Sequence, residues 1–598
     1  MESSPVNWLC DPLPGYNEPP VAPLLPLGDP QILVDKNVRP SPLSKTVYQL
    51  FWKLNGFWGF YKSLTPEELE KLLRTVNVRL PGLYSPIISA TLLLEHSHYT
   101  STDWLSRATA LVLAAQSFYE DLMKGRLEQD NIKGMPLEMG EYPNLFGTVL
   151  AVEGTHVTFL KNRDPKYLLV ISNGWYYCVP LEKDFQKLRN ILETCYLDSQ
   201  NRKSALHNSI GWITAAENRI QFFAWKRLRK NPLFRAELEK INDIFLTLCL
   251  DSPVVPESDN DAARFIHIDN PGNRFYLSGT QLVVFANAVA GVIFNFTAYI
   301  DGNPMSRFAN ELYKRSEIQL EKNINGLKNY QQVENAKIKP LELKVPPVIL
   351  TKTIRSVRRI IDGQQHTFQL TGFGRKAFGA YERDAVPLIV LALMAAIHKL
   401  TGRVPIVEQF VSMAHFRGMG LTRVKVTTPE CREICELLNS SSSEEAATEL
   451  TEKIRTCIRS QKHHVHRVRQ YMPISLLETL YINSQSKIKR PWIFANILFR
   501  ELLIKLTNHT LNPPVDILLS HPRILDGFRI FGRPGIRLPY VRQFGLHYLV
   551  YPDKLLLTFM PGVRWRIPNA IVVHELQKQL EKLIQFIQVL QEKRTIAK

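Results

Sequence analysis

Cysteine is scarce in this chain, and the few cysteines show no pattern of a metal site. Seven are spread over 598 residues, and their odd number excludes complete pairing within one chain. Cys431 and Cys435 are four residues apart, as on one turn of a helix, but no second cluster stands at ligand spacing. We therefore expect no metal ion, and we expect reduced cysteines in an ordinary core.

Long apolar runs free of polar residues are missing as well. Residues 385–397 are apolar but too few to cross a bilayer, and residues 282–300 are interrupted by two asparagines and a glycine. Residues 1–11 are neither basic nor continuously apolar, and the final Ile596-Ala597-Lys598 is not a peroxisomal tripeptide. We expect no transmembrane segment, no signal peptide and a cytoplasmic location.

Negative charge is in deficit, because 56 acidic residues face 74 basic ones and leave a net charge of +18. Such an excess favours partners that carry negative charge, such as nucleic acid, an anionic membrane or a phosphorylated small molecule. Basic residues gather at positions 462–469, with a smaller group at Arg355, Arg358 and Arg359. Because no nucleic-acid-binding motif accompanies them, we do not expect nucleic acid as a partner.

The residues that are present indicate a folded chain with both helices and strands. A hydrophobic share of 45% is typical of a globular protein, and 598 residues exceed what one core holds. Hydrophobic periodicity predicts helices at residues 46–61, 65–75, 102–127, 213–251, 386–400, 444–469 and 571–590. Strands are predicted at residues 167–181, where Asn173-Gly174 indicates a hairpin, and at 275–299 and 548–559. Without a regular βαβ repeat, this order predicts mixed sheets covered by helices in two lobes.

A distinctive motif lies at residues 273–296. Asn273-Arg274-Phe275-Tyr276 is followed by Gln281, an apolar stretch, Asn287, and residues 291–296. This order resembles the choline/carnitine acyltransferase family, whose segment runs Asn-Arg-Trp-Phe-Asp, Gln, an apolar strand, Asn-Gly and Gly-x-x-x-Glu-His. Further stretches resemble the same family in the same order along the chain: residues 136–146, 167–181, 214–251, 373–385, 408–416 and 541–548.

The resemblance implies an α/β (α+β) fold of two chloramphenicol-acetyltransferase-like lobes with a tunnel between them. We expect an N-terminal helical region and the first lobe in residues 46–340, and the second lobe in residues 341–598. Residues 1–45 are rich in proline, which a helix interior does not tolerate, and are predicted to form an extended strap. An acyl-coenzyme A thioester would enter the tunnel from one side and the acyl acceptor from the other, in a chain that we expect to be a monomer.

The catalytic residues that the resemblance implies are replaced. Acyl transfer needs a base for the acceptor hydroxyl, and the family uses its histidine. Phe296 stands at that position and Asn295 replaces the preceding glutamate. The family's Ser-Thr-Ser run, which supplies hydroxyls to the oxyanion, corresponds to residues 520–535 with one serine and no threonine. The acceptor motif is changed at residues 419–425, which makes carnitine and choline poor candidate substrates.

The coenzyme A segment of the family is partly kept. Arg375 and Lys376 are positioned to meet a phosphate, and Asp384 matches the family's aspartate. The lysine pair that follows in the family is replaced around residues 378–380, which weakens phosphate binding without abolishing it. Coenzyme A or its thioester is therefore the expected small-molecule partner, as a co-substrate and not as a bound cofactor.

A relocated base is the alternative to a silent site. His415 lies beside the acceptor segment and is the first candidate, followed by His398, His267 and His547. A lone histidine near a core is nevertheless more often structural. Whether the chain is an enzyme thus stays open between three functions. The first is a pseudoenzyme that keeps a coenzyme A, acyl or protein partner; the second is an active O-acyltransferase with a non-carnitine acceptor; the third is a polyanion-binding protein.

Overall fold

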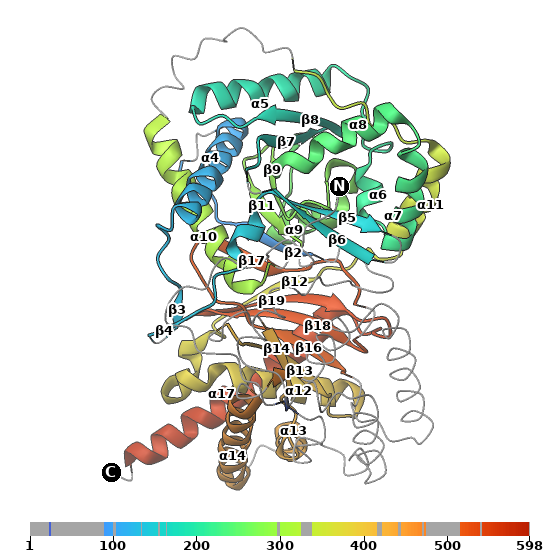
Figure 1. Cartoon of the computed structure of the whole chain (residues 1–598). Helices are drawn as coiled ribbons and strands as arrows, with labels where there is room; N and C mark the ends of the chain where they lie inside the picture. Colours follow the sequence, from blue (N-terminus) through green and yellow to red (C-terminus); the bar gives the residue numbers. More distant parts are fainter. Residues whose placement is uncertain are drawn as a thin grey trace.

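The computed structural model describes most of the chain as two bodies stacked on each other (Figure 1). The described residues are 23–24, 89–99, 103–132, 134–153, 156–162, 164–295, 300–323, 338–414, 421–440, 444–468, 472–473, 515–538 and 541–596. The helices predicted at 46–61 and 65–75 and nearly all of the predicted N-terminal strap lie outside these ranges. The exception is the pair Pro23–Leu24, β1, which lies parallel to Met472–Pro473, β15.

The first body is built on a seven-stranded mixed sheet. Its order is β17 (Phe528–Gly532), β2 (Ala90–Leu94), β11 (Ala290–Phe294), β10 (Thr280–Phe285), β9 (Ile244–Asp251), β7 (Tyr167–Ser172) and β8 (Trp175–Pro180). β9 runs parallel to both of its neighbours, and the other pairs are antiparallel. The predicted hairpin is confirmed, because β7 and β8 flank Asn173-Gly174 with both residues at positive φ.

The prediction of continuous helix over residues 213–251 is wrong at its end. Helices α6 (Gly211–Ala215), α7 (Asn218–Leu228) and α8 (Pro232–Lys240) are present, but residues 244–251 form the central strand β9. Every residue of β9 is buried. A strand that is covered on both faces carries a continuous apolar run, and periodicity alone does not separate such a run from a buried helix.

The second body has a six-stranded mixed sheet with helices on the face away from the first body (Figure 1). Its order is β12 (Thr367–Thr371), β19 (Lys554–Pro561), β18 (Phe544–Val550), β16 (Ile517–Ser520), β13 (Val407–Ser412) and β14 (Leu421–Lys425). The helices are α12 (Ala385–Thr401), α13 (Glu430–Ser440), α14 (Glu444–Val468) and α17 (Asn569–Ile596). The predicted helices at 386–400, 444–469 and 571–590 and the strands at 548–559 are confirmed.

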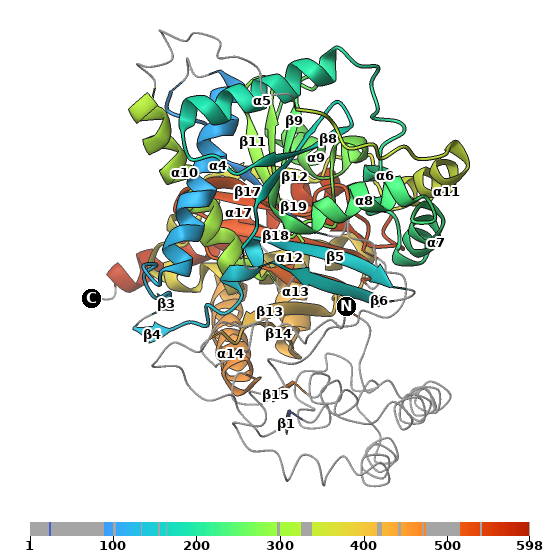
Figure 2. The same ribbon diagram turned by 45° about the horizontal axis from the view of Figure 1, so that its top comes forward.

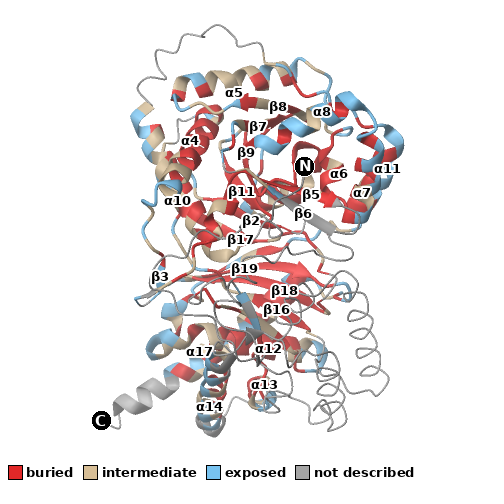
Figure 3. Ribbon diagram, in the orientation of Figure 1, coloured by how far each residue is buried: buried red, intermediate tan, exposed pale blue. Residues whose placement is uncertain are grey.

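Each body has its own buried core (Figure 3). In the first, α4 (Trp104–Met123) and α10 (Gly302–Asn323) lie side by side against the sheet, as Figure 2 shows. Besides α6, α7 and α8, this body contains the α-helices α5 (Phe185–Gln200), α9 (Asp259–Arg264) and α11 (Pro347–Arg358). Two short hairpins complete it, β3–β4 (Asn131–Ile132 and Met135–Pro136) and β5–β6 (Thr148–Glu153 and His156–Lys161).

One described helical stretch, Arg375–Thr401, is long and apolar enough to cross a membrane by length and composition. Its mean hydropathy is 1.6, but 61% of its apolar window is buried inside the structure. Residues 388–397 of α12 are all buried in the second core. The apolar character of this stretch is thus accounted for by the core that it fills.

The two bodies are joined by strand exchange and by polar contacts. β17 comes from the C-terminal part of the chain, yet it pairs with β2 at the edge of the first sheet. Arg529 on β17 donates to Asp259 at 2.9 Å, which fixes β17 in the first body, and between the bodies the side-chain oxygen of Asn260 accepts the backbone N–H of Thr367 at 3.1 Å. These contacts hold one face of the second sheet against β17, and the candidate site is built on that face.

Candidate functional site

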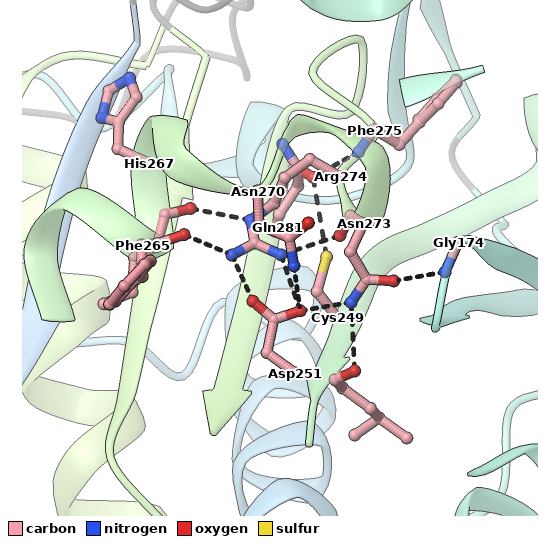
Figure 4. Close-up of polar contacts among 12 residues, drawn as sticks. Gly174, Cys249, Asp251, Phe265, His267, Asn270, Asn273, Arg274, Phe275 and Gln281 are labelled. Atoms are coloured by element: carbon pink, nitrogen blue, oxygen red, sulfur yellow. Dashed lines mark hydrogen bonds and ion pairs between the residues drawn. The ribbon is translucent and has the colours of Figure 1, made fainter. Parts of the chain in front are cut away.

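A fully buried polar network orders the turn before β10 (Figure 4). Arg274 donates to Asp251 at 2.7 Å, and neither side chain is exposed. Arg274 also donates to the carbonyl of Ile266 at 2.8 Å, and Asn273 donates to Asp251 and to the carbonyl of Leu250. A buried ion pair is stable only when such additional hydrogen bonds satisfy its remaining donors and acceptors.

This network joins two motifs that the sequence singled out far apart, residues 249–251 and residues 273–276. Gln281 extends it, because its side-chain oxygen accepts the backbone N–H of Phe275 at 2.8 Å. The motif thus fixes the path of the chain into β10 and β11, which end at the family's catalytic position. Its role here is to support the framework, not to contact a substrate.

The residues at the family's catalytic position are only partly described. Asn295 directly follows β11 and is buried; its backbone N–H donates to Gly279 at 2.9 Å and its amide to the carbonyl of Tyr276 at 2.6 Å. Its side chain therefore ties the end of β11 to the preceding turn. Phe296 lies outside the described residues, so the prediction that its ring narrows a tunnel stays a prediction.

The candidate histidines separate by their surroundings. His415 lies outside the described residues, although the carbonyl of Ala414 before it accepts the backbone N–H of Glu138 at 2.5 Å. His267 is buried in the first body, and its Nδ1 contacts the hydroxyl of Thr91. His398 lies in the last turn of α12, with its Nδ1 3.2 Å from the amide of Asn439 on the helical side. Both of these histidines have a side-chain partner at Nδ1.

His547 on β18 is different. Side chains alternate along a strand, and Leu549 packs in the first core whereas Leu546 and Tyr548 pack in the second. His547 shares the face of Leu549, and its ring lies 5.3 Å from that of Phe531 on β17. It is 5% exposed, and its Nδ1 has no hydrogen-bond partner among the described residues. Burial, with a smaller effect of Arg533, lowers the pKa of His547 to about 3.

Two hydroxyl residues flank His547 in the second sheet. Ser520 at the end of β16 is its partner on one side, and Thr558 on β19 is its partner on the other. Leu518 packs on the face toward the first body, and Ser520, two residues later, shares that face. We call Ser520, His547 and Thr558 the polar row.

A pair of carboxyl groups was missed by the sequence reasoning. Glu141 precedes the turn Tyr142–Leu145, and its Oε2 accepts the backbone N–H of Asp301 at 2.9 Å. Burial, and next the charge of Asp301, hold the pKa of Glu141 well above its ordinary value. Burial raises the pKa of Asp301 to about 6. The signal was present, because Glu141 stands where the family has glutamine, and Asp301-Gly302 resembles the Asp-Gly after the family's histidine, one residue late.

The coenzyme A segment is docked on the turn between β18 and β19. The backbone N–H groups of Arg375 and Lys376 donate to the carbonyls of Tyr551 and Pro552 at 2.8 and 2.9 Å. A side chain at Gly374 would come within 2.5 Å of the backbone of residues 553–554, so only glycine allows this approach. Both basic side chains are left exposed to solvent.

Asp384 ends the same segment and meets a residue from the basic run. Lys462 on α14 donates to its carboxylate at 2.5 Å. Lys462 also lines a cavity of about 430 Å³ between α12, α14 and β13, with these other lining residues: Val386, Pro387, Val390, Gln409, Val426, Ile458, Gln461, Val465 and His466. The cavity thus opens beside the coenzyme A segment, with a largely apolar wall and the ammonium group of Lys462 at its edge.

Two basic residues that precede this run on α14 are partly neutralised. Lys453 pairs with Glu433 and Glu449, and Arg455 lies 3.6 Å from Glu452. Cys431 and Cys435 do lie on one helix, α13, but Cys431 faces Cys457 with 3.6 Å between the two sulfurs. The described residues hold no group of three histidines, cysteines or acids that could bind a metal ion.

The chain is similar to known acyltransferases in its sequence. The model of the choline/carnitine O-acyltransferase family matches residues 81–509. The mitochondrial carnitine O-acetyltransferase of Saccharomyces cerevisiae is 22% identical over 397 residues, which cover 62% of this chain and 57% of that protein. Carnitine O-acetyltransferase YAT2 of the same yeast is 23% identical over 51% of this chain and 40% of that protein. The chain thus spans about half the length of these relatives.

Solved structures show a weaker likeness. The starter condensation domain of rhizomide synthetase RzmA aligns with 92% of this chain and 93% of its own, at 9% identity and a TM-score of 0.35. Polyketide synthase associated protein 5 from Mycobacterium tuberculosis aligns with 85% of this chain and 98% of its own, at 9% identity and a TM-score of 0.32.

Proposed function

Because the chain belongs to the choline/carnitine acyltransferase family, we propose that it binds coenzyme A or its acyl thioesters and is a pseudoenzyme for the family's own reaction. The observation that carries this proposal is the docking of residues 374–384 on the β18–β19 turn, which leaves Arg375 and Lys376 free in solvent. Two adjacent cations on a fixed backbone suit a phosphate group, and the net charge of +18 favours a polyanionic ligand.

The loss of transfer to carnitine and choline is supported by two replacements. Phe296 has no proton acceptor, so the family's base is missing. In the acceptor segment, Lys425 lies directly opposite Glu408 in the β13–β14 pair, and Arg423 donates to Glu408 at 3.3 Å. The segment thus carries two cations against one carboxylate, and its remaining positive charge is a poor match for the quaternary ammonium group that carnitine and choline share.

Calorimetric titration of the full chain with coenzyme A and with palmitoyl-coenzyme A tests this proposal. We expect saturable binding of both, weakened roughly ten-fold or more in the double variant R375A/K376A because two phosphate contacts are lost. The matched control is R358A/R359A, which removes the same charge from an exposed part of α11 and its C-terminus. Binding that is absent, or that both double variants weaken equally, would contradict the proposal.

An activity assay tests the second half of the proposal. We expect no release of coenzyme A thiol above background when acetyl- or palmitoyl-coenzyme A is mixed with carnitine or choline. Release that depends on either acceptor would show that the family's reaction is retained. The cytoplasmic location and the monomeric state stay predictions.

A further inference from the structure

The polar row on the second sheet provides a base that the family position lacks. His547 is buried at the contact between the two bodies, with its ring against Phe531 of the first sheet and its Nδ1 unpartnered among the described residues. A buried polar nitrogen without a hydrogen bond costs stability. An apolar side chain would avoid this cost, and a ligand that supplies a hydrogen-bond partner to Nδ1 would offset it.

We propose that His547 is the base of a relocated acyl-transfer site on the second sheet, whereas the family's catalytic position follows β11 of the first sheet. This inference rests on the thioester binding proposed above. The acceptor it fits is an uncharged aliphatic alcohol, because the residues that share its face are mainly apolar: Leu518, Leu538, Leu549 and Met560.

The neighbours of His547 show from which side a substrate reaches it. On the β19 side, Thr558 is 1% exposed, and a side chain at Gly532 would come within 2.5 Å of its Cγ2. That side is closed by the backbone of β17. On the β16 side, Ser520 is only partly buried. The accessible side of the row is therefore that of Ser520, and its hydroxyl is the donor that we assign to the oxyanion.

Two other histidines of the same body also have a buried ring nitrogen without a hydrogen-bond partner among the described residues, Nε2 of His366 and Nε2 of His521. Nδ1 of His366 lies 3.1 Å from the amide of Asn569, and its Nε2 lies 3.9 Å from Asp362. His521 follows Ser520 but packs its ring on Tyr548, which belongs to the second core and so faces away from the first body. His547 differs from both in its place, because its ring lies against Phe531 of the first sheet.

The reaction balances with no further reactant. His547, neutral at ordinary pH because burial lowers its pKa, takes the hydroxyl proton while the alcohol oxygen attacks the thioester carbonyl carbon. The carbon–sulfur bond of the tetrahedral intermediate then breaks. The coenzyme A thiolate leaves and receives the proton from the imidazolium, which restores neutral His547 and yields an ester and free thiol.

The test measures thiol release from octanoyl-coenzyme A by the full chain with 1-butanol under single-turnover conditions. We expect release and butyl octanoate from the wild type, and a rate at least 100-fold lower in H547F with unchanged thioester affinity. His547→Phe keeps an aromatic ring against Phe531, and H398Q is the control that should retain the full rate. In H547A, added imidazole should restore part of the rate, which a purely structural histidine would not show.

Each outcome bears on one claim. A wild type that binds octanoyl-coenzyme A but releases no thiol would overturn the inference and leave the binding proposal intact, and so would a fully active H547F. Free octanoate without ester would show that water is the acceptor and would contradict the proposal of an alcohol acceptor. If octanoyl-coenzyme A does not bind at all, the proposed function itself is contradicted.

Discussion

The Asp251–Arg274 network and the polar row are both buried, yet they differ in how their polar atoms are satisfied. In the network, the guanidinium of Arg274 meets a carboxylate and backbone carbonyls within the first body. In the polar row, Nδ1 of His547 meets no described partner at the contact with the other body. The residues that resemble the family are thus those whose polar groups are fully hydrogen-bonded to one another. The buried polar group that lacks a described partner, His547, is the one that we take to mark a site.

The largest expected effect is the loss of the ion pair in the network. Arg274→Met leaves the buried carboxylate of Asp251 without its cation, and breaking such a pair costs about 3–5 kcal/mol. Urea denaturation of the variant against R358M, an exposed arginine on α11, measures this loss in the free energy of unfolding. A cost below about 1 kcal/mol would mean that the network is not the framework described here.

A smaller effect of opposite sign is expected from Glu141→Gln, which restores the family's residue. The pKa of Glu141 is raised in the folded state, so its contribution to stability is present below pH ~4.5 and lost as pH rises through the folded pKa. The variant has no such loss and should be more stable than the wild type at pH 7. Thermal unfolding across pH 4 to 7 measures it; a gain as large at pH 4 as at pH 7 would contradict this origin, and E382Q at an exposed site is the control.

His547→Phe should change how the free energy of unfolding depends on pH. The folded pKa of about 3 lies below the unfolded value of about 6.5, so only the unfolded state takes up a proton as pH falls through 6.5. Between pH 7.5 and 5.5 the wild type should lose about 1.4 kcal/mol that the variant keeps. Paired denaturation curves at the two pH values measure the difference, and an identical pH dependence would show that His547 is not buried as a neutral group.

The smallest effect, a change in affinity for coenzyme A, is expected from Lys462→Ala on α14, beside the coenzyme A segment. Its pair with Asp384 is more than half exposed at the lysine, and exposed pairs contribute less than about 1 kcal/mol. Affinity for coenzyme A should fall roughly three-fold in calorimetry, whereas R459A, an exposed cation on the same helix, should leave it unchanged. A stronger loss in R459A than in K462A would move the binding site away from Asp384.

Much of the framework could be predicted from the sequence because its signals are local. Asn173-Gly174 between two apolar runs specifies a hairpin with any neighbours, and the helix at 385–401 follows from a long apolar stretch that ends at Gly402 in the left-handed conformation. β9 was not predicted because its strand conformation depends on pairing with β7 and β10, which are distant in the sequence.

The candidate site was harder to predict for the same reason. His547 was one histidine among several until the strand register set it beside Ser520 and Thr558 and against Phe531. Glu141 and Asp301 are 160 residues apart, and only the fold brings them together. Lys462 belonged to a basic run in the sequence, whereas its contact with Asp384 assigns it to the coenzyme A segment.

The most direct test of this account is a crystal structure of the chain with a non-hydrolysable thioether analogue of octanoyl-coenzyme A. The account predicts phosphate groups beside Arg375 and Lys376, and the analogue's carbonyl between the two bodies within hydrogen-bond reach of the polar row. A ligand bound elsewhere on the chain, or crystals that stay free of ligand at saturating concentration, would contradict it.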